Sequence, residues 1–194
     1  MINNLLRDWK CDVVCLQETK VAKMDLGMVR SLWSNPYLGW VALNAVNTAG
    51  GIVLMWDKRI LERIENEVGT FSVSCRWKGI SDGFEWACSG IYGPNLDGIK
   101  SAMWGELSDV KQRWNVPWCA IGDFNVVCFP SERLGCESFG LSMSKFSDWI
   151  DHLNLVDLPL IGGTFMWCNG AILPRCPELI ELWFHQIGRI TFRM

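Results

Sequence analysis

No apolar run in this 194-residue sequence approaches the roughly 18 residues that a membrane-spanning helix requires. The first ten residues, MINNLLRDWK, are amphipathic and polar and do not have the pattern of a signal peptide. Internal repeats, linkers and low-complexity segments are missing as well. We therefore expect an intracellular protein, nuclear or cytoplasmic, that has no membrane partner.

Clustered metal ligands of the zinc-site kind are also missing. The nine cysteines include no C-x-x-C pair, and most lie inside apolar runs such as DVVCLQ and PWCAIG. A zinc site needs several nitrogen or sulfur ligands close together. We therefore expect reduced thiols in the core of an intracellular protein. Of the two histidines, we expect His152 to be a solvated surface residue on a helix.

The sequence has no excess of basic charge. Its 18 Lys and Arg residues are outnumbered by 21 Asp and Glu residues, which gives a net charge of -3 and no overall basic footprint for nucleic acid. A local basic rim beside an acidic site is still compatible with such a partner. Apolar residues make up 49% of the chain and charged residues 20%, as in globular proteins. This length suits one domain with a sizeable core, or a fragment of a larger domain.

Hydrophobic periodicity predicts a mixed α/β (α+β) chain. Apolar or alternating runs indicate strands over 12–18, 40–45, 51–56, 70–77, 84–92, 117–127 and 162–167. Apolar residues at helical spacing indicate helices over 2–9, 24–33, 102–114 and 146–153. Strand pairs come without regular helical crossovers, which favours layered sheets over a doubly wound parallel sheet. In the helix over 102–114, we expect Met103, Leu107 and Val110 to pack on a sheet.

Polar side chains stand where several of these apolar runs end. They are Glu18 after the first strand, Tyr92 and Asn95 after the strand over 84–92, and Asp123 and Asn125 in the run IGDFNVV. Burying an unpaired polar group costs roughly 2–7 kcal/mol, so the place of Asp123 and Asn125 among apolar residues needs an explanation. Carboxylates suit Mg²⁺ and general-base chemistry, while amide and phenol donors stabilise charge on phosphate oxygens.

Structural explanations of the same residues remain open. Asp123 could cap a turn, because GDFN is compatible with an Asx-turn. Glu18 could be a solvated loop residue beside Lys20, and YGPN is an ordinary turn sequence. The order of these residues along the chain, each at a strand end, is more informative than any one of them.

The motifs CDVVCLQETK, GGIVLMWD, GIYGPN, IGDFNVV and GGTFMWCN resemble the endonuclease/exonuclease/phosphatase superfamily, which includes deoxyribonuclease I, apurinic endonucleases and inositol polyphosphate 5-phosphatases. Within it, FPSERLG and the residues that flank the motifs resemble the endonuclease domain of plant LINE-type retrotransposons. The resemblance covers about residues 3–169. It implies a four-layer α/β sandwich of two sheets, hydrolysis of phosphodiesters with Mg²⁺ or Mn²⁺, and DNA as the partner.

The resemblance also implies a role for each matching residue. Glu18 would bind the metal, and Tyr92 would contact the scissile phosphate. Asn95 would support the loop that carries Tyr92. Asp123 would orient and deprotonate the attacking water, and Asn125 would hold both Asp123 and the phosphate.

Three parts of the family pattern are missing from the sequence. They are a first-strand Asn expected before residue 1, an Asp-bearing strand expected after Trp167, and a Ser-Asp-His motif. We therefore expect an incomplete domain over 1–169 with weak or no activity. The alternatives are a catalytically dead module that binds phosphate or nucleic acid, and a non-functional, unstable fragment.

Residues 170–194 do not continue the family pattern. With suitable codon choices, the shifted frame of this segment encodes Ser-Arg-Ile-Asp-Arg, the kind of motif that is missing. We therefore expect 170–194 to be a non-homologous tail produced by a frame change. It should pack poorly, with at most a fortuitous helix over 177–187.

Overall fold

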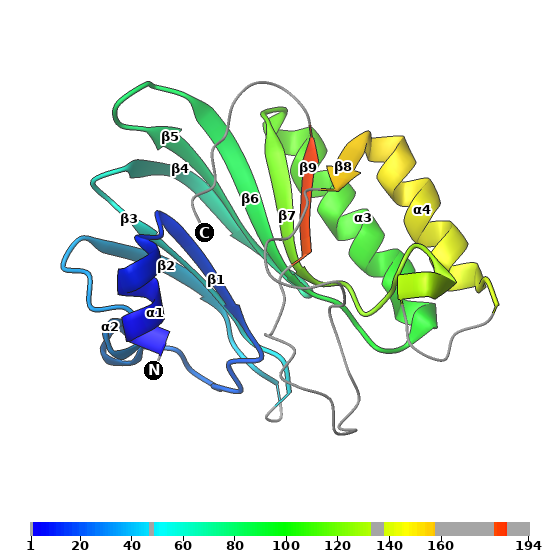
Figure 1. Ribbon diagram of the computed structural model, residues 1–194, viewed down its shortest axis with the longest axis horizontal. Helices are drawn as coiled ribbons and strands as arrows, with labels where there is room; N and C mark the ends of the chain where they lie inside the picture. Colours follow the sequence, from blue (N-terminus) through cyan, green and yellow to red (C-terminus); the bar gives the residue numbers. More distant parts are fainter. Residues whose placement is uncertain (1, 47–48, 133–137, 158–180, 186–194) are drawn as a thin grey trace.

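The computed structural model describes residues 2–46, 49–132, 138–157 and 181–185. Within this part of the chain, two β-sheets pack face to face, and helices cover the outer face of each sheet (Figure 1). This arrangement is the four-layer α/β sandwich that the family resemblance implies, and it confirms the layered sheets that periodicity predicts. None of the described helices combines the length and the apolar character that a membrane crossing needs.

The first sheet is built by the N-terminal third of the chain. It contains three described antiparallel strands in the order β1-β3-β2, namely β1 (Val13–Gln17), β3 (Ile52–Asp57) and β2 (Leu38–Leu43). Helices α1 (Ile2–Trp9) and α2 (Leu26–Leu32) cover its outer face (Figure 1). Strand β3 is buried in the middle of the sheet, which explains the continuous apolar run of its first five residues before Asp57.

The second sheet contains six described strands in the order β4-β5-β6-β7-β9-β8. The strands are β4 (Leu61–Val68), β5 (Ser72–Gly79), β6 (Glu85–Tyr92), β7 (Trp118–Asp123), β8 (Leu155–Asp157) and β9 (Glu181–His185). Its neighbouring pairs are antiparallel except β6 and β7, which run parallel. The crossover between these two is α3 (Asp97–Trp114), which covers the outer face together with α4 (Leu141–Leu153); a short 3-10 helix, Pro130–Glu132, precedes α4.

Three apolar clusters hold the layers together, and tryptophan contributes to each of them. The cluster between the sheets contains, among others, Cys15, Trp56, Trp77, Trp86, Cys88 and Cys119. The cluster under α1 and α2 contains Leu6, Val29, Trp33 and Met55, and the cluster under α3 and α4 contains Leu107, Trp118, Phe124, Phe146 and Trp149.

Several expectations about the core are confirmed. Met103 and Leu107 of α3 are fully buried and Val110 is 1% exposed, so this helix face packs on the sheet as predicted. The six described cysteines are free thiols, and five of them are buried. His152 is exposed on α4, as expected.

The boundaries of some elements differ from the prediction. The strand expected over 117–127 ends at Asp123, because Asn125 adopts a left-handed backbone with φ 52°. Helices α3 and α4 each begin five residues before the predicted start, at Asp97 and Leu141. Strand β4 was not predicted because its sequence, LERIENEV, is mostly exposed and polar on both faces, which hides the alternation of an edge strand.

The prediction of at most a helix over 177–187 is wrong for residues 181–185, which form β9. This strand pairs antiparallel with β7, from Cys119↔Phe184 to Gly122↔Glu181, and also with β8. Strand β7 would otherwise present unpaired backbone groups on that side, and the bulky residues of ELWFH favour an extended chain. The strand expected over 162–167 lies outside the described residues.

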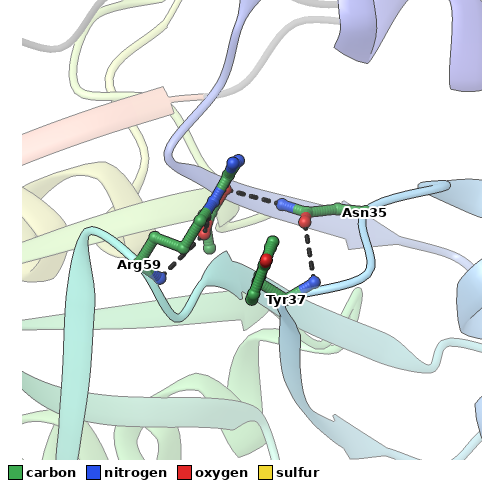
Figure 2. A network of polar contacts seen from close by, with 4 residues as sticks. Asn35, Tyr37 and Arg59 are labelled. Carbon is green, nitrogen blue, oxygen red and sulfur yellow. Dashed lines mark hydrogen bonds and ion pairs between the residues drawn. The ribbon is translucent and has the colours of Figure 1, made fainter.

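A polar network around the buried Asp57 lies at the far end of β3 (Figure 2). The Asp57 side chain, in a residue only 5% exposed, accepts hydrogen bonds from Asn35 Nδ2 at 2.8 Å and from the Arg59 backbone N–H at 2.8 Å. The Arg59 guanidinium also donates to both carboxylate oxygens, at 2.6–3.1 Å, and lies 4.7 Å from the centre of the Tyr37 ring. These bonds outweigh the effect of burial and lower the pKa of Asp57 to about 2.

Candidate active site

The candidate site lies at one edge of the sandwich, where β1, β6 and β7 end. Strands β6 and β7 are parallel neighbours, and Tyr92 pairs in register with Asp123 at their carboxyl ends. Glu18 follows directly after β1, which belongs to the other sheet. Both sheets therefore contribute to this edge, as is common for sites on layered α/β scaffolds.

Tyr92 and Glu18 make a direct contact between the two sheets. The Tyr92 hydroxyl donates a hydrogen bond to Glu18 Oε1 at 2.9 Å. Burial, this hydrogen bond to Glu18, and the negative charges of Glu18 and Asp123 raise the pKa of Tyr92 to about 12. Tyr92 therefore stays a neutral hydrogen-bond donor at physiological pH.

The loop that carries Glu18 is fixed by its backbone. Glu18 has a left-handed φ of 48°, and the next two N–H groups, of Thr19 and Lys20, donate to the carbonyls of Gly51 and Gly50 at 3.2 and 3.0 Å. A Cβ on Gly51, which has φ 89°, would lie 2.4 Å from Thr19 Oγ1. The Lys20 ammonium also lies 3.7 Å from Glu18 Oε2, and both side chains are exposed, so Glu18 is a solvated loop residue that also contacts Tyr92.

Asp123 is exposed to solvent, yet surrounding protein displaces enough water to raise the pKa of its carboxyl. The hydrogen bond from the Asn125 backbone N–H, at 2.7 Å to Oδ1, acts in the opposite direction. The charge of Glu18 raises the pKa further, while that of Lys100 lowers it. A carboxylate with a raised pKa is a stronger base than an ordinary aspartate.

Asn125 ties together the loops that follow β6 and β7. Its left-handed backbone places its N–H on Asp123, which is the Asx-turn contact that GDFN allows. Its side-chain Nδ2 donates to the Gly93 carbonyl at 2.7 Å, and the Gly93 N–H donates to the Asp123 carbonyl at 2.6 Å. A turn-forming role and a place in the candidate site therefore coexist in one residue.

Asn95 is not brought into this network. It lies exposed in the loop between β6 and α3, and among the described residues no side-chain hydrogen bond to it is present. Its support of the Tyr92 loop stays a prediction.

Gln17 is a site residue that the sequence reasoning missed. Its Oε1 accepts a hydrogen bond from the Asp123 backbone N–H at 3.2 Å, and its Nε2 donates to the Ile91 carbonyl. It therefore links the end of β1 to the ends of β6 and β7. Gly122 makes room for this link, because a Cβ there would lie 2.1 Å from Gln17 Nε2. The sequence signal for Gln17 was the alternation of side chains along a strand, which puts residues 15 and 17 on the same face, and Cys15 is buried between the sheets.

The donor set fits a hard divalent cation. Glu18 and Asp123 present carboxylates close enough for each to influence the same tyrosine, and their mutual repulsion helps to raise the pKa of Asp123. Within the described residues, no group of three His, Cys, Asp or Glu is placed to hold a metal ion. Mg²⁺ commonly binds through one or two carboxylates and keeps several waters, so two carboxylates are enough for it.

Comparison with protein-family models and with curated proteins finds no match to the sequence. Solved structures do match. An endonuclease/exonuclease/phosphatase family protein from Bacteroides thetaiotaomicron superposes with a TM-score of 0.64 and 11% identity, over 94% of this chain and 72% of that one. The human Nocturnin catalytic domain gives 0.59 and 15%, over 93% and 72%. The AP endonuclease from Leishmania major gives 0.61 and 16%, over 80% and 61%.

The chain therefore has the fold of the endonuclease/exonuclease/phosphatase proteins, the deoxyribonuclease I-like fold. At these identities the likeness establishes the fold. By their descriptions, these neighbours are a catalytic domain, an endonuclease/exonuclease/phosphatase family protein and an AP endonuclease.

Proposed function

We propose that the chain is a DNA-directed phosphodiesterase domain of the metal-dependent nuclease type, with low or no hydrolytic activity in this form. The observation that carries the proposal is the Tyr92–Glu18 hydrogen bond across the two sheets, with Asp123 paired in register beside Tyr92. A neutral phenol and two carboxylates on one sheet edge are the groups that phosphoryl chemistry uses.

The roles follow from the chemistry of each group. Glu18, with Asp123 nearby, would hold Mg²⁺ or Mn²⁺, which when bound supplies positive charge to phosphate oxygens. Asp123 accepts a proton from the attacking water, and its raised pKa favours this role. Tyr92 donates a hydrogen bond to a phosphate oxygen, and Asn125 holds Asp123 in place through its backbone N–H. Asn95 is the member with the least support, because among the described residues no side-chain hydrogen bond links it to the site.

Low activity is proposed because the described site contains no imidazole. His152 is exposed on α4 and has no part in the hydrogen bonds around Asp123. Losing one member of a cooperating catalytic set lowers rates by several powers of ten. The alternative with the same geometry is a phosphate- or nucleic-acid-binding module without catalysis. The support for descent from a decayed LINE-type retroelement of a plant is the amino-acid sequence of the motifs and of the residues that flank them.

Plasmid nicking tests this proposal. The full chain and its Asp123→Ala variant are incubated with supercoiled plasmid and Mg²⁺ or Mn²⁺, and a gel shift is measured in EDTA. We expect DNA binding by both proteins, with nicking no greater in the wild type than in the variant. Reproducible nicking that Asp123→Ala abolishes would overturn the low-activity part and support the catalytic assignment. If the wild type shows no nicking and no DNA binding, the choice of DNA as the partner is overturned.

A metal titration supplies a readout that does not depend on activity. Mg²⁺ or Mn²⁺ should raise the thermal unfolding midpoint of the wild type, because a ligand that binds only the folded state stabilises it. Glu18→Gln should remove this shift. An equal shift in both proteins would show that the cation binds elsewhere.

A further inference from the structure

A hollow of about 220 Å³ lies between the first turns of α3 and α4. It is lined by Lys100, Ser142 and Lys145, together with Asp97 and the Trp104 ring. Two lysines and one aspartate give its polar lining an excess of positive charge, in a chain whose net charge is -3. The hollow is therefore a local basic feature of an acidic protein.

Lys100 is the unusual member of this hollow. It is only 6% exposed, and lysine is almost never buried unless it is paired. Its ammonium donates to Asp97 Oδ1 at 2.8 Å. An ammonium has three N–H donors, so Asp97 alone does not use its hydrogen-bonding capacity. A buried cation with donors to spare favours a second anionic partner.

The helix ends around the hollow add positive potential. The residues that precede α3 and α4 are Leu96 and Gly140, and neither carries a side-chain acceptor for the first-turn N–H groups. Two helix N-termini thus meet in one hollow without side-chain caps. Partial positive charge at helix N-termini favours anions, above all phosphate.

The hollow lies next to the candidate active site. The charge of Lys100 is close enough to Asp123 to lower the pKa of that carboxyl. Trp104, which lines the hollow, stacks on the buried Phe124 with ring centres 6.0 Å apart, so the hollow packs against the segment that follows β7. A strand whose scissile phosphate sits at Asp123 would bring a neighbouring backbone phosphate toward this hollow.

We propose that the hollow between α3 and α4 is a subsite for a backbone phosphate that flanks the scissile phosphate of a polynucleotide, bound by Lys100 and Lys145. This inference rests on the proposed function, because it takes the substrate to be a nucleic-acid strand. It adds a defined place where the chain distinguishes a polymer from a small phosphate ester. Phosphate is the recognised group, and the source is the polynucleotide backbone and not the free anion.

Binding measurements on the full chain test the subsite apart from catalysis. Fluorescence anisotropy of a labelled duplex oligonucleotide is measured in EDTA over a range of salt concentrations, for the wild type, Lys145→Gln and Lys100→Met. We expect each variant to bind about five-fold more weakly, with a salt slope lower by about one, as for the loss of one phosphate contact. Lys145 is exposed, so Lys145→Gln keeps the test valid if Lys100→Met does not fold.

Lys58→Gln is the matched control. Lys58 is an exposed lysine next to Asp57, at the opposite end of β3 from Ile52, which pairs with Gln17 beside the site. Its binding curve and salt slope should equal those of the wild type. Wild-type binding by Lys145→Gln, or an equal loss in Lys58→Gln, would overturn the subsite.

Inorganic phosphate separates the two sources of the anion. We expect millimolar phosphate to compete weakly with the oligonucleotide, and less in Lys145→Gln than in the wild type. Phosphate binding that depends on Lys145, in a wild-type protein that does not bind the oligonucleotide, would overturn the assignment to a polynucleotide. If the wild type binds DNA and the lysine variants bind it equally well, the subsite is overturned and the proposed function stands. If the wild type does not bind DNA, both the subsite and the proposed function are overturned.

Discussion

Asp57→Asn tests how much the buried network at the far end of β3 stabilises the fold. The drop in the pKa of Asp57 from 3.8 to about 2 corresponds to at most about 2.4 kcal/mol of folding free energy at neutral pH. The Arg59 side chain is 59% exposed, so solvent screens part of this interaction. We therefore expect Asp57→Asn to lower the free energy of unfolding by about 1–2 kcal/mol at pH 7.

The pH dependence gives the sharper test of the same network. Because the folded-state pKa is lowered, the stabilisation is fully present above 3.8 and is lost as the pH falls toward about 2. Urea unfolding followed by tryptophan fluorescence should therefore show a gap between wild type and Asp57→Asn that shrinks as the pH falls. Asp109→Asn, an exposed residue on α3, should change stability by less than about 0.5 kcal/mol throughout. A gap that stays constant down to pH 3 would refute a charge-dependent network.

The other predictions concern the core, the site and the tail. Leu107→Ala should lower the free energy of unfolding by roughly 2–5 kcal/mol, because its side chain is fully buried; a loss below about 1 kcal/mol in urea unfolding would contradict that packing. Gln17→Ala should abolish the Mg²⁺-dependent rise in the unfolding midpoint while the fold persists, since it releases the Asp123 backbone; an unchanged rise would show that Gln17 does not position the site. Glu18→Gln should lower the pKa of Tyr92 from about 12, measured by ultraviolet titration of the phenol, because it removes a negative charge that favours the neutral form; no change would separate the two residues. Genomic sequence should show that a correction of one or two bases near codon 170 restores an Asp-bearing strand with Ser-Asp-His further downstream, and its absence from both other frames would end that hypothesis.

The strand ends of the candidate site were predictable because each apolar run stops at a polar residue. Tyr92 and Asp123 end buried strands and Glu18 directly follows β1, and the structure places them at one edge of the sandwich. For Asn125 the sequence allowed two outcomes, because strict alternation continues the strand whereas GDFN allows an Asx-turn, and the chain adopts the turn with a left-handed Asn125. The tie made by Gln17 depends on a contact across 106 positions of sequence, which periodicity does not register.

The prediction missed strands that are formed by pairing with a strand distant in the sequence. Strand β4 is polar on both faces and is held by its pairing with β5, which no local pattern reveals. Strand β9 depends on the open side of β7, a partner more than fifty residues earlier in the chain. Local sequence therefore predicted the buried strands and the helices that cover them, whereas β4 and β9 became visible only with their tertiary partners.

The candidate site is divided between two sheets that are separate stretches of the chain. Glu18 and Gln17 precede β4, whereas Tyr92 and Asp123 follow it. A polypeptide cut in the turn between β3 and β4 would leave each fragment with half of the site. Reassociation of the fragments through the apolar layer between the sheets would restore the Tyr92–Glu18 contact. The pKa of Tyr92 therefore reports whether the two sheets have docked. Following it while the two fragments associate would show when the site forms.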